Sequence, residues 1–440
     1  MAVSWLERLA ARAPVPVYPL LGIGGERVLY ELALAGRVAR VDSPRHASVL
    51  LVAGHVPAQH HEALKRVHDQ LPRPFATLWF RSQPLPGLEN ARRADDLATL
   101  ADELVALHRE LHTGQRGSSP RLLPDEPPNP WQGLGDDGHG GEGMMGGTPY
   151  GRPMAMNMQD DIRDGLTLDS LTFRLGPFYP LLPPGLAAEI TLQGDVIQSW
   201  TSLSSAYPRA LDAIFQTARE QPVSIAELEL ARARHHLRQL YLALRLAGLE
   251  SLGLQALRLA RGLTPASRIN GLRRRLMRSG FFNLAALDGG VLDAEMARRL
   301  GGPAARAAGI DADLRRDDAH YRRLGFSPVL SWGSDTRARW QQALGEIEQS
   351  LALARRAVDE GDPLTAAPGN VETPCGPWRD RPSPAAGGCL DELLPGLEWD
   401  SALATIASLD LAPVSASPPP GEASAESASA SSGSHEEGAP

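Results

Sequence analysis

Hydrophobic and polar positions divide the chain into segments of different character. The first, residues 1–112, contains two runs typical of buried strands, Ala47–Gly54 and Phe75–Phe80. A helical pattern follows each run, over Pro57–Leu71 and Ala91–Leu111. Because strands that alternate with helices usually pair in parallel, this segment predicts an α/β domain around a parallel sheet.

Two stretches lack hydrophobic periodicity. Residues 113–165 are rich in glycine, proline and methionine and predict a long connector. Such a connector either wraps a neighbour or stays disordered, and Met144, Met145 and Met154 favour wrapping because they offer apolar anchors. Residues 413–440 are rich in serine, alanine, proline and glutamate, which predicts a disordered tail.

The remaining segment, residues 166–412, begins with strand patterns and continues with helical ones. Strands are expected over Leu168–Gly176 and Leu186–Trp200. Leucines at three- and four-residue spacing then predict helices within Ile225–Leu263 and over Asp335–Val358. The segment therefore predicts a mostly helical α+β domain with a small antiparallel sheet at its entrance.

Composition narrows the class of protein. A chain of 440 residues with 42% hydrophobic content can bury a full core, and its length suggests two or three domains. A net charge of −8 argues against nucleic acid as a partner. The longest apolar helix, Leu237–Leu259, is interrupted by charged residues, and the N-terminus has no clean signal-peptide core. We expect a soluble, cytoplasmic protein that reaches a membrane only through partners.

Several histidines and the two cysteines are candidate ligands. His108 and His112 are spaced to share a zinc ion, but no third ligand follows, and histidines at a helix C-terminus are favourable by the helix dipole alone. His60, His61 and His68 are expected on a solvated helix face.

His235 and His236 are expected to divide between surface and interface. Cys375 and Cys389 are most simply two thiols, because the sequence identifies no partners for them as metal ligands. The glycines of Gly22–Gly25 do not complete a phosphate-binding fingerprint.

Short motifs occur in a fixed order between Gly176 and Asp410. They are Gly176–Pro180, Gln193–Ile197, Gly289–Val291, Gly302–Arg316, Gly333–Ser350, Val371–Gly376, Arg381–Ser383 and Ile406–Asp410. This order resembles the large subunit shared by respiratory complex I, where it is called the D-subunit, and the membrane-bound nickel–iron hydrogenases. Ser43–Pro74 resembles the partner B-subunit or small subunit, which implies a flavodoxin-like N-terminal domain. The chain therefore resembles a fusion of the two subunits.

The resemblance also identifies what is missing. Its cluster cysteines would fall at Gly24, Gly25, Gln83 and Leu88, none of which is a thiolate ligand. The two nickel–iron cysteine pairs would fall around residues 204–214 and after Asp410, where the chain has no cysteine. We therefore expect neither an iron–sulfur nor a nickel–iron centre, no metal site and no catalytic residue.

A quinone pocket is the remaining cofactor site that the resemblance implies. Tyr179 stands where the family has a histidine, and a phenol still donates a hydrogen bond to a quinone carbonyl. We expect a quinone-sized cavity between the two domains, lined by Tyr179, Tyr207, Asp335 and Asp410.

Three functions follow as hypotheses. The first is a subunit of a complex I-like or energy-converting hydrogenase-like assembly that has lost its centres and lies at the inner membrane through membrane-arm subunits. The second is a non-catalytic scaffold or assembly factor for such a complex. The third, an oxidoreductase with a cofactor bound elsewhere, has no nucleotide or flavin motif in its favour.

Overall fold

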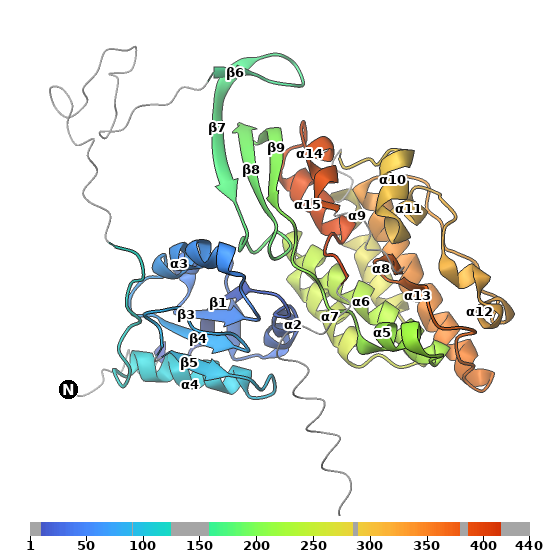
Figure 1. Ribbon diagram of the computed structural model, residues 1–440, viewed down its shortest axis with the longest axis horizontal. Helices are drawn as coiled ribbons and strands as arrows, with labels where there is room; N and C mark the ends of the chain where they lie inside the picture. Colours follow the sequence, from blue (N-terminus) through green and yellow to red (C-terminus); the bar gives the residue numbers. More distant parts are fainter. Residues whose placement is uncertain (1–9, 90, 125–157, 285–288, 379–385, 415–440) are drawn as a thin grey trace, which may run out of the picture.

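A computed structural model of the protein describes residues 10–89, 91–124, 158–284, 289–378 and 386–414. These residues form an α/β unit at the N-terminus and a larger unit of one antiparallel sheet and many helices (Figure 1). Within the described residues, no helix is both long enough and apolar enough to cross a membrane.

The N-terminal unit is built on a five-stranded parallel sheet. Its strands are β1 (Val15–Leu21), β2 (Val38–Arg40), β3 (Val49–Ala53), β4 (Ala76–Phe80) and β5 (Arg92–Ala94). They lie in the order β2-β1-β3-β4-β5, with every pair parallel. The parallel sheet expected from the sequence is therefore present, and β3 and β4 fall within the two predicted strand runs.

Strand β1 did not emerge from the sequence pattern because it contains Pro16 and Pro19, which normally demote a central strand. The register explains how both are tolerated. The N–H of Val15 and the carbonyl of Val17 form hydrogen bonds toward β2, so the backbone of every second residue, including Pro19, faces β2. Because β2 ends at Arg40, the missing N–H of Pro19 has no β2 residue opposite it. The carbonyl of Pro16 accepts a hydrogen bond from the N–H of Ser48, just before β3 begins. The pairing of β1 with β3 starts at Val17, so the missing N–H of Pro16 removes no hydrogen bond between these strands.

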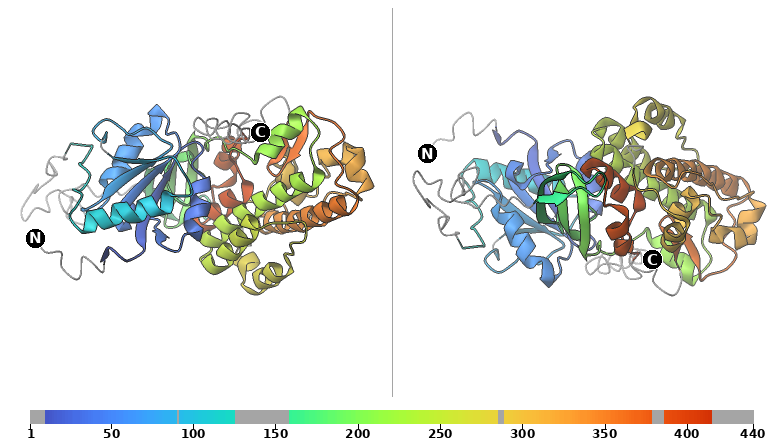
Figure 2. Two further views of the ribbon diagram at one scale, coloured as in Figure 1. Left: turned by 90° about the horizontal axis from the view of Figure 1, so that it is seen from below. Right: turned by 90° about the horizontal axis from the view of Figure 1, so that it is seen from above.

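Helices cover both faces of this sheet (Figure 2). On one face, α2 (Arg27–Leu34) and α4 (Leu100–His112) pack on the strands. On the other, α3 (His61–Asp69) packs beside two aromatic residues of the second unit, Phe178 and Tyr207. All five residues of β3 are buried, as expected for a strand covered on both sides.

Two sequence predictions for this unit were wrong. The helix predicted over Ala91–Leu111 begins only at Leu100, because β5 occupies Arg92–Ala94 and the Asp96 carboxylate accepts a hydrogen bond from the N–H of Ala98 in a turn. The face of His60, His61 and His68 is not simply solvated. The His68 side chain is fully buried against Phe75, and His60 contacts the second unit.

His108 provides a pH-dependent contribution to stability. Its Nε2–H donates to the Ala10 carbonyl at 3.1 Å, and its Nδ1 bonds the Ser48 hydroxyl at 2.9 Å. Burial lowers its pKa below the ordinary value of 6.5. As pH falls below about 6.5, the unfolded chain takes up a proton that the folded state excludes, so the free energy of unfolding decreases.

Acidification from pH 7.5 to 5 should therefore lower the unfolding temperature, and this decrease should be smaller in His108→Gln. Thermal unfolding at the two pH values measures it. His46→Gln, which removes an exposed histidine instead, is the matched control. Equal pH dependence in all three proteins would contradict the assignment.

The second unit opens with an antiparallel meander, β6-β7-β8-β9. Its strands are β6 (Met158–Asp160), β7 (Thr167–Leu175), β8 (Ala187–Gln193) and β9 (Val196–Ser204). The sequence suggested a continuous strand over Leu186–Trp200, whereas Gly194 and Asp195 form a two-residue turn, with Gly194 at φ +60°. The small antiparallel sheet expected at the entrance of this unit is present.

Helices make up the rest of this unit. They are α5 (Ala213–Glu220), α6 (Ile225–Leu246), α7 (Glu250–Arg261), α8 (Asn270–Arg278), α9 (Phe281–Leu284), α10 (Ala294–Leu300), α11 (Gly302–Ala307), α12 (Ala319–Arg323), α13 (Thr336–Asp359), α14 (Leu390–Leu393) and α15 (Trp399–Leu409). A short hairpin, β10 (Val371–Thr373) and β11 (Gly376–Trp378), lies between α13 and α14. The predicted helix over Leu237–Leu259 is divided into α6 and α7 at Gly248, which adopts a positive φ of 72°.

The structure describes both ends of the segment predicted as a connector and the start of the predicted tail. Leu122 packs against the sheet, and the Asp69 carboxylate accepts bonds from the N–H groups of Leu122 and Leu123. Residues 125–157, including the methionines expected to anchor the connector, lie outside the described residues, as does most of the predicted tail. The carbonyl of Pro413 accepts a hydrogen bond from the N–H of Arg209, so the first residue of the predicted tail contacts the second unit.

A buried network of charges holds α6, α11 and α13 together. The fully buried Arg306 guanidinium bonds Glu346 and Glu372, each at 2.8 Å, and lies 3.2 Å from Asp313. Burial opposes ionisation of Glu346, but Arg306 overcomes it and holds the pKa of this carboxyl well below its usual range. Arg315 extends the network to Glu229 of α6.

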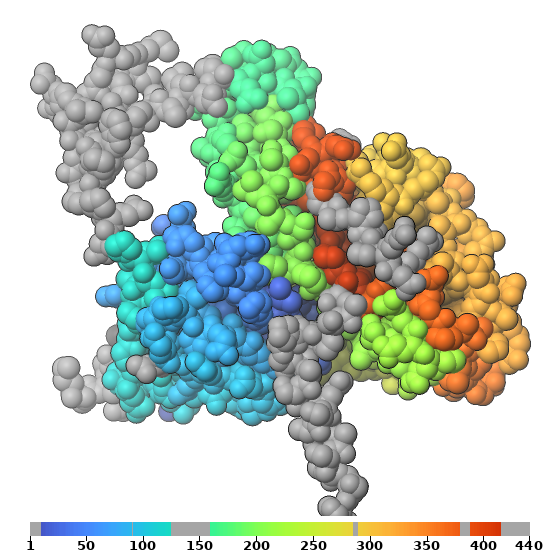
Figure 3. All heavy atoms as spheres, in the orientation of Figure 1, coloured from blue at the N-terminus to red at the C-terminus, as the bar shows by residue number. Residues whose placement is uncertain are grey.

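The two units pack directly against each other (Figure 3). The Tyr18 hydroxyl of β1 donates to the Phe178 carbonyl at 2.7 Å. At the other end of the contact, Arg245 of α6 bonds both carboxylate oxygens of Asp42 at 2.8 Å. These contacts bring the start of α2 toward the C-terminal end of α15.

Candidate functional site

The site is centred on Asp410, the residue that ends α15. Asp410 adopts a left-handed conformation with φ 49° and ψ 56°. That conformation costs free energy for a residue other than glycine, and surrounding contacts must maintain it. In this conformation the Asp410 carboxylate lies among residues from several segments that are distant in the sequence.

Arg209 is the first of these contacts, and it joins the two units. Its Nη1 bonds Asp410 Oδ1, and its Nε donates to Glu26 Oε2 at 2.7 Å. A second bond from Nη2 to Glu26 Oε1, at 3.2 Å, makes the pair with Glu26 bidentate. Glu26 immediately precedes α2, so one guanidinium links the N-terminal unit to α15.

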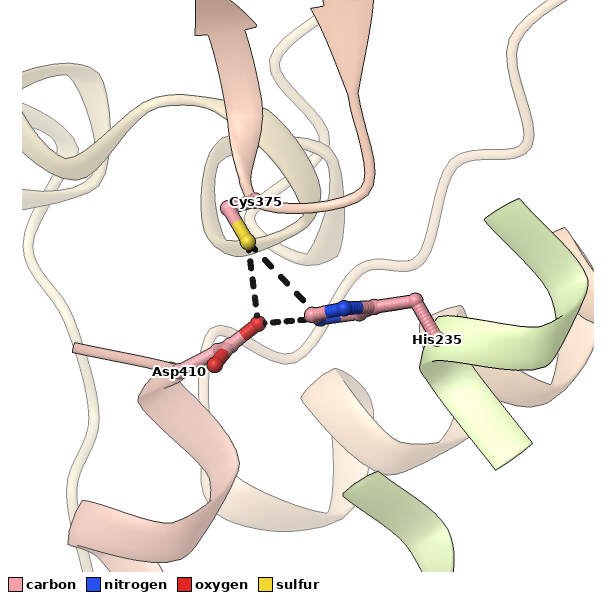
Figure 4. A group of neighbouring side chains, drawn as sticks. All are labelled: His235, Cys375 and Asp410. Carbon is pink, nitrogen blue, oxygen red and sulfur yellow. Dashed lines mark hydrogen bonds and ion pairs between the residues drawn. The ribbon is translucent and has the colours of Figure 1, made fainter. Parts of the chain in front are cut away.

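His235 and Cys375 approach the other carboxylate oxygen (Figure 4). His235 Nε2, on α6, lies 2.7 Å from Asp410 Oδ2. The Cys375 thiol, in the turn between β10 and β11, donates to the same oxygen at 3.2 Å, and its Sγ lies 3.7 Å from His235 Nε2. Three kinds of ligand atom therefore converge on one small volume.

The electrostatics of this cluster separate its members into ionised and neutral groups. Burial favours the protonated form of Asp410, but the Arg209 charge and the hydrogen bond from the His235 imidazole outweigh it and hold the pKa of Asp410 far below its usual range. Burial lowers the pKa of His235 despite the opposing Asp410 charge, so the imidazole is neutral near pH 7. Burial and the Asp410 carboxylate raise the pKa of the Cys375 thiol well above its usual range.

Three cavities meet around the cluster. One, of about 640 Å³, is lined by Cys375, Asp410 and His236, and another, of about 330 Å³, by Arg209 and His235. The third, of about 100 Å³, lies between the two units and has mostly apolar walls.

The residues predicted to line a quinone-like cavity are only partly brought together. Tyr179 and Asp410 both line the cavity of about 100 Å³. Tyr207 lines the cavity of about 330 Å³ instead, and its hydroxyl shares a 2.6 Å hydrogen bond with His60 Nδ1. Asp335 lines none of the three cavities; it caps α13, accepting from the N–H of Ala338 at 2.7 Å. That Asp335 lines a quinone-like cavity stays a prediction.

Sequence reasoning missed Glu26, Arg209 and His235 as members of the site, and treated Cys375 as a simple thiol. These residues are separated by up to hundreds of positions and follow no ligand spacing. The pairing of Cys375 with Asp410 depends on how the β10–β11 turn packs beside α15, which periodicity does not reveal.

The positions where the family resemblance would put cluster cysteines do not fit an iron–sulfur cluster. A Cβ at Gly25 would lie 2.2 Å from the Ala53 carbonyl oxygen, and Leu88 is buried in the core beside the sheet. No cysteine occurs at any of the four positions. The cluster around Asp410 does not fit a nickel–iron centre either, because it contains one thiol where two cysteine pairs are needed.

The tight approach at Gly25 gives a testable prediction. Gly25→Ala should lower the free energy of unfolding by about 1–3 kcal/mol, because the added methyl meets backbone that must shift. Gly36→Ala is the matched control, since no heavy atom lies within 4 Å of its added Cβ, and it should change stability by less than about 0.5 kcal/mol. Urea unfolding measures both, and equal effects would refute this account of the loop.

Comparison with known families finds a match in the second unit. Residues 265–374 match the model of the respiratory-chain NADH dehydrogenase 49 Kd subunit. The matched residues include Arg306, Glu346 and Glu372 of the buried charge network and end one residue before Cys375.

Individual relatives agree with this match. The second NADH-quinone oxidoreductase D-subunit of Salinispora arenicola is 36% identical over 111 residues, 24% of this chain and 29% of that protein. The NADH-quinone oxidoreductase D-subunit of Clostridium beijerinckii is 34% identical over 94 residues, 20% of this chain and 25% of that protein. The chain thus spans less than a third of the length of these curated relatives. The resemblance to the D-subunit stated from the motifs is confirmed over this part of the chain.

A solved structure with a weaker likeness is the membrane-bound sulfane sulfur reductase, an archaeal respiratory membrane complex. One of its chains matches with a TM-score of 0.40 and 18% identity, over 55% of this chain and 96% of that one. A likeness of this size does not establish a common fold. His235, Cys375 and Asp410 all lie outside the 265–374 match.

Proposed function

We propose that the chain is a subunit of a complex I-like or energy-converting hydrogenase-like respiratory assembly and holds no iron–sulfur or nickel–iron centre of its own. The match of residues 265–374 to the 49 Kd subunit carries the proposal. The protein's partners would be membrane-arm subunits of that assembly, and it would lie at the inner membrane by binding them.

The N-terminal unit supports a fusion of two subunits. Its strand order, β2-β1-β3-β4-β5, is that of flavodoxin-like sheets. It packs on the D-subunit-like unit through Phe178 and Tyr207, so the two units make one continuous body. This packing supports the proposal that a B-subunit-like domain and a D-subunit-like domain face each other within one chain.

The loss of redox centres rests on the donor atoms present. Iron–sulfur clusters need thiolates, and the loop at Gly25 has neither sulfur nor room for a side chain. The positions where the resemblance would put cluster ligands therefore supply no thiolate for an inorganic electron relay.

The cavity of about 100 Å³ supports a residual quinone-like site. Burial, and then the Asp42 charge, raise the pKa of Tyr179, so its hydroxyl keeps its proton and can donate to a carbonyl. Tyr179→Phe should then weaken binding of a short-chain, water-soluble quinone several-fold in a titration. Unchanged binding would remove Tyr179 from the proposal.

Co-purification tests the proposed function. The full chain, tagged in its native host and extracted with a mild detergent, should purify with membrane subunits in fixed stoichiometry. Isolation of the chain alone from the membrane-free fraction would refute a subunit role. Association only with immature complex precursors would replace it by the assembly-factor hypothesis.

A further inference from the structure

The three side chains that converge beside Arg209 carry an inference that does not depend on the proposed function. His235, Cys375 and Asp410 come from α6, the β10–β11 turn and the end of α15, and each turns one ligand atom toward the others (Figure 4). Their Nε2, Sγ and Oδ2 atoms all lie within 4.8 Å of one another. We propose that they bind one Zn²⁺ ion, with its fourth position open to the adjoining cavity.

The arrangement differs from that of a nucleophilic cysteine. In a Cys-His-Asp triad the carboxylate binds one imidazole nitrogen and the thiol faces the other. Here Sγ and Oδ2 both face Nε2, so the carboxylate cannot orient the imidazole toward the thiol in that way. Three atoms that face one common point are what a metal ion requires.

The distances are close to those of a zinc site. Zinc–ligand bonds of roughly 2.0–2.3 Å at tetrahedral angles place neighbouring ligand atoms about 3.3–3.6 Å apart. The Sγ–Oδ2 and Sγ–Nε2 separations are 3.2 and 3.7 Å. The Nε2–Oδ2 pair, at 2.7 Å, must open most, by roughly half an ångström. One nitrogen, one sulfur and one oxygen ligand suit zinc among the common divalent ions.

Charge balance within the cluster also favours a cation. Glu26, Arg209 and Asp410 carry two negative charges and one positive charge in a place that is only partly exposed, which leaves one net negative charge. When Zn²⁺ binds, Cys375 releases its proton to solvent and a Zn–S bond forms, which makes the five side chains and the ion neutral together. Arg209 holds Oδ1 and leaves Oδ2 for the metal, so it orients that ligand from outside.

The cavities define the open position. Cys375 and Asp410 line the space of about 640 Å³, so a water molecule from that space can complete the coordination. Three protein ligands with an exchangeable water define a site that can also accept a small anionic or thiol ligand from the cavity.

Cobalt substitution of the full chain tests this proposal. After chelator dialysis, one equivalent of Co²⁺ should give tetrahedral visible bands and a sulfur-to-cobalt charge-transfer band, and Zn²⁺ should displace both. Cys375→Ser should abolish the charge-transfer band, and Asp410→Asn should weaken binding about tenfold or more. Cys389→Ser is the matched control, since it removes the other thiol and should behave as wild type.

Any of three results would overturn the proposal. The charge-transfer band could be missing in the wild-type protein, it could persist in Cys375→Ser, or it could be lost in Cys389→Ser. Circular dichroism of each variant shows whether it has folded. His235→Gln provides a second ligand variant that leaves both thiols in place, and it should bind zinc at least about tenfold more weakly. A zinc ion that Cys375 does not bind, for example on surface histidines, counts against the proposal.

Discussion

Replacing Arg306 by methionine should destabilise the helical unit more than any single surface change in this protein. The side chain is fully buried and bonds Glu346 and Glu372 while lying beside Asp313. Methionine fills similar volume but leaves these carboxylates without their shared cation. Removing one partner of a buried ion pair typically costs about 3–5 kcal/mol, because the remaining charge is left uncompensated.

Two further variants identify the cause. Arg306→Lys keeps the charge but loses the planar fork, so its loss should be intermediate. Arg316→Met removes an exposed arginine that pairs with Asp311, and should cost less than about 1 kcal/mol. Urea unfolding followed by circular dichroism measures all three. If Arg306→Met and Arg316→Met unfold at the same urea concentration, the network does not stabilise the fold as described.

Replacing Arg209 by methionine should loosen the junction between the two units. Arg209 is the cation shared by Glu26 of one unit and Asp410 of the other, and its side chain is only 10% exposed. Its removal leaves two carboxylates near each other without a counter-charge, which we expect to cost about 3–5 kcal/mol. Because these carboxylates belong to different units, their repulsion should weaken the contact between the two units.

Hydrogen exchange separates loss of docking from general unfolding. In Arg209→Met, amides at the start of α2 and the end of α15 should exchange faster, while the centre of the parallel sheet keeps its protection. Arg234→Met is the control, because Arg234 pairs with Asp212 at a more exposed position. Exchange in α2 and α15 that matches the wild type would show that Arg209 does not hold the units together.

The sequence predicted those parts of the fold in which local pattern and tertiary packing agree. β3, β4 and α13 lie where hydrophobic period predicts them, because their apolar residues face the core directly. β1 was missed since its prolines look incompatible with a central strand until the ends of its neighbours are known. The breaks at Gly248 and at Gly194–Asp195 depend on backbone conformations that hydrophobicity does not encode.

The candidate site was less predictable than the fold. Tyr179 and Asp410 were named in advance and do share a cavity, but Asp335 serves as a helix cap. Arg209, His235 and Cys375 meet Asp410 only because α6, α15 and the β10–β11 turn pack together across long sequence separations. Contacts of that kind follow from tertiary packing, and no spacing rule applies to them.

Metal and spectroscopic analysis of the chain purified anaerobically from its native host tests the central claim most directly. The claim is that a D-subunit-like body, fused to an α/β unit, persists without the sulfur ligands of a redox centre. Elemental analysis should find neither iron nor nickel in stoichiometric amount, and the dithionite-reduced protein should give no iron–sulfur EPR signal. Iron in cluster stoichiometry with such a signal, or one nickel per chain, would contradict the account.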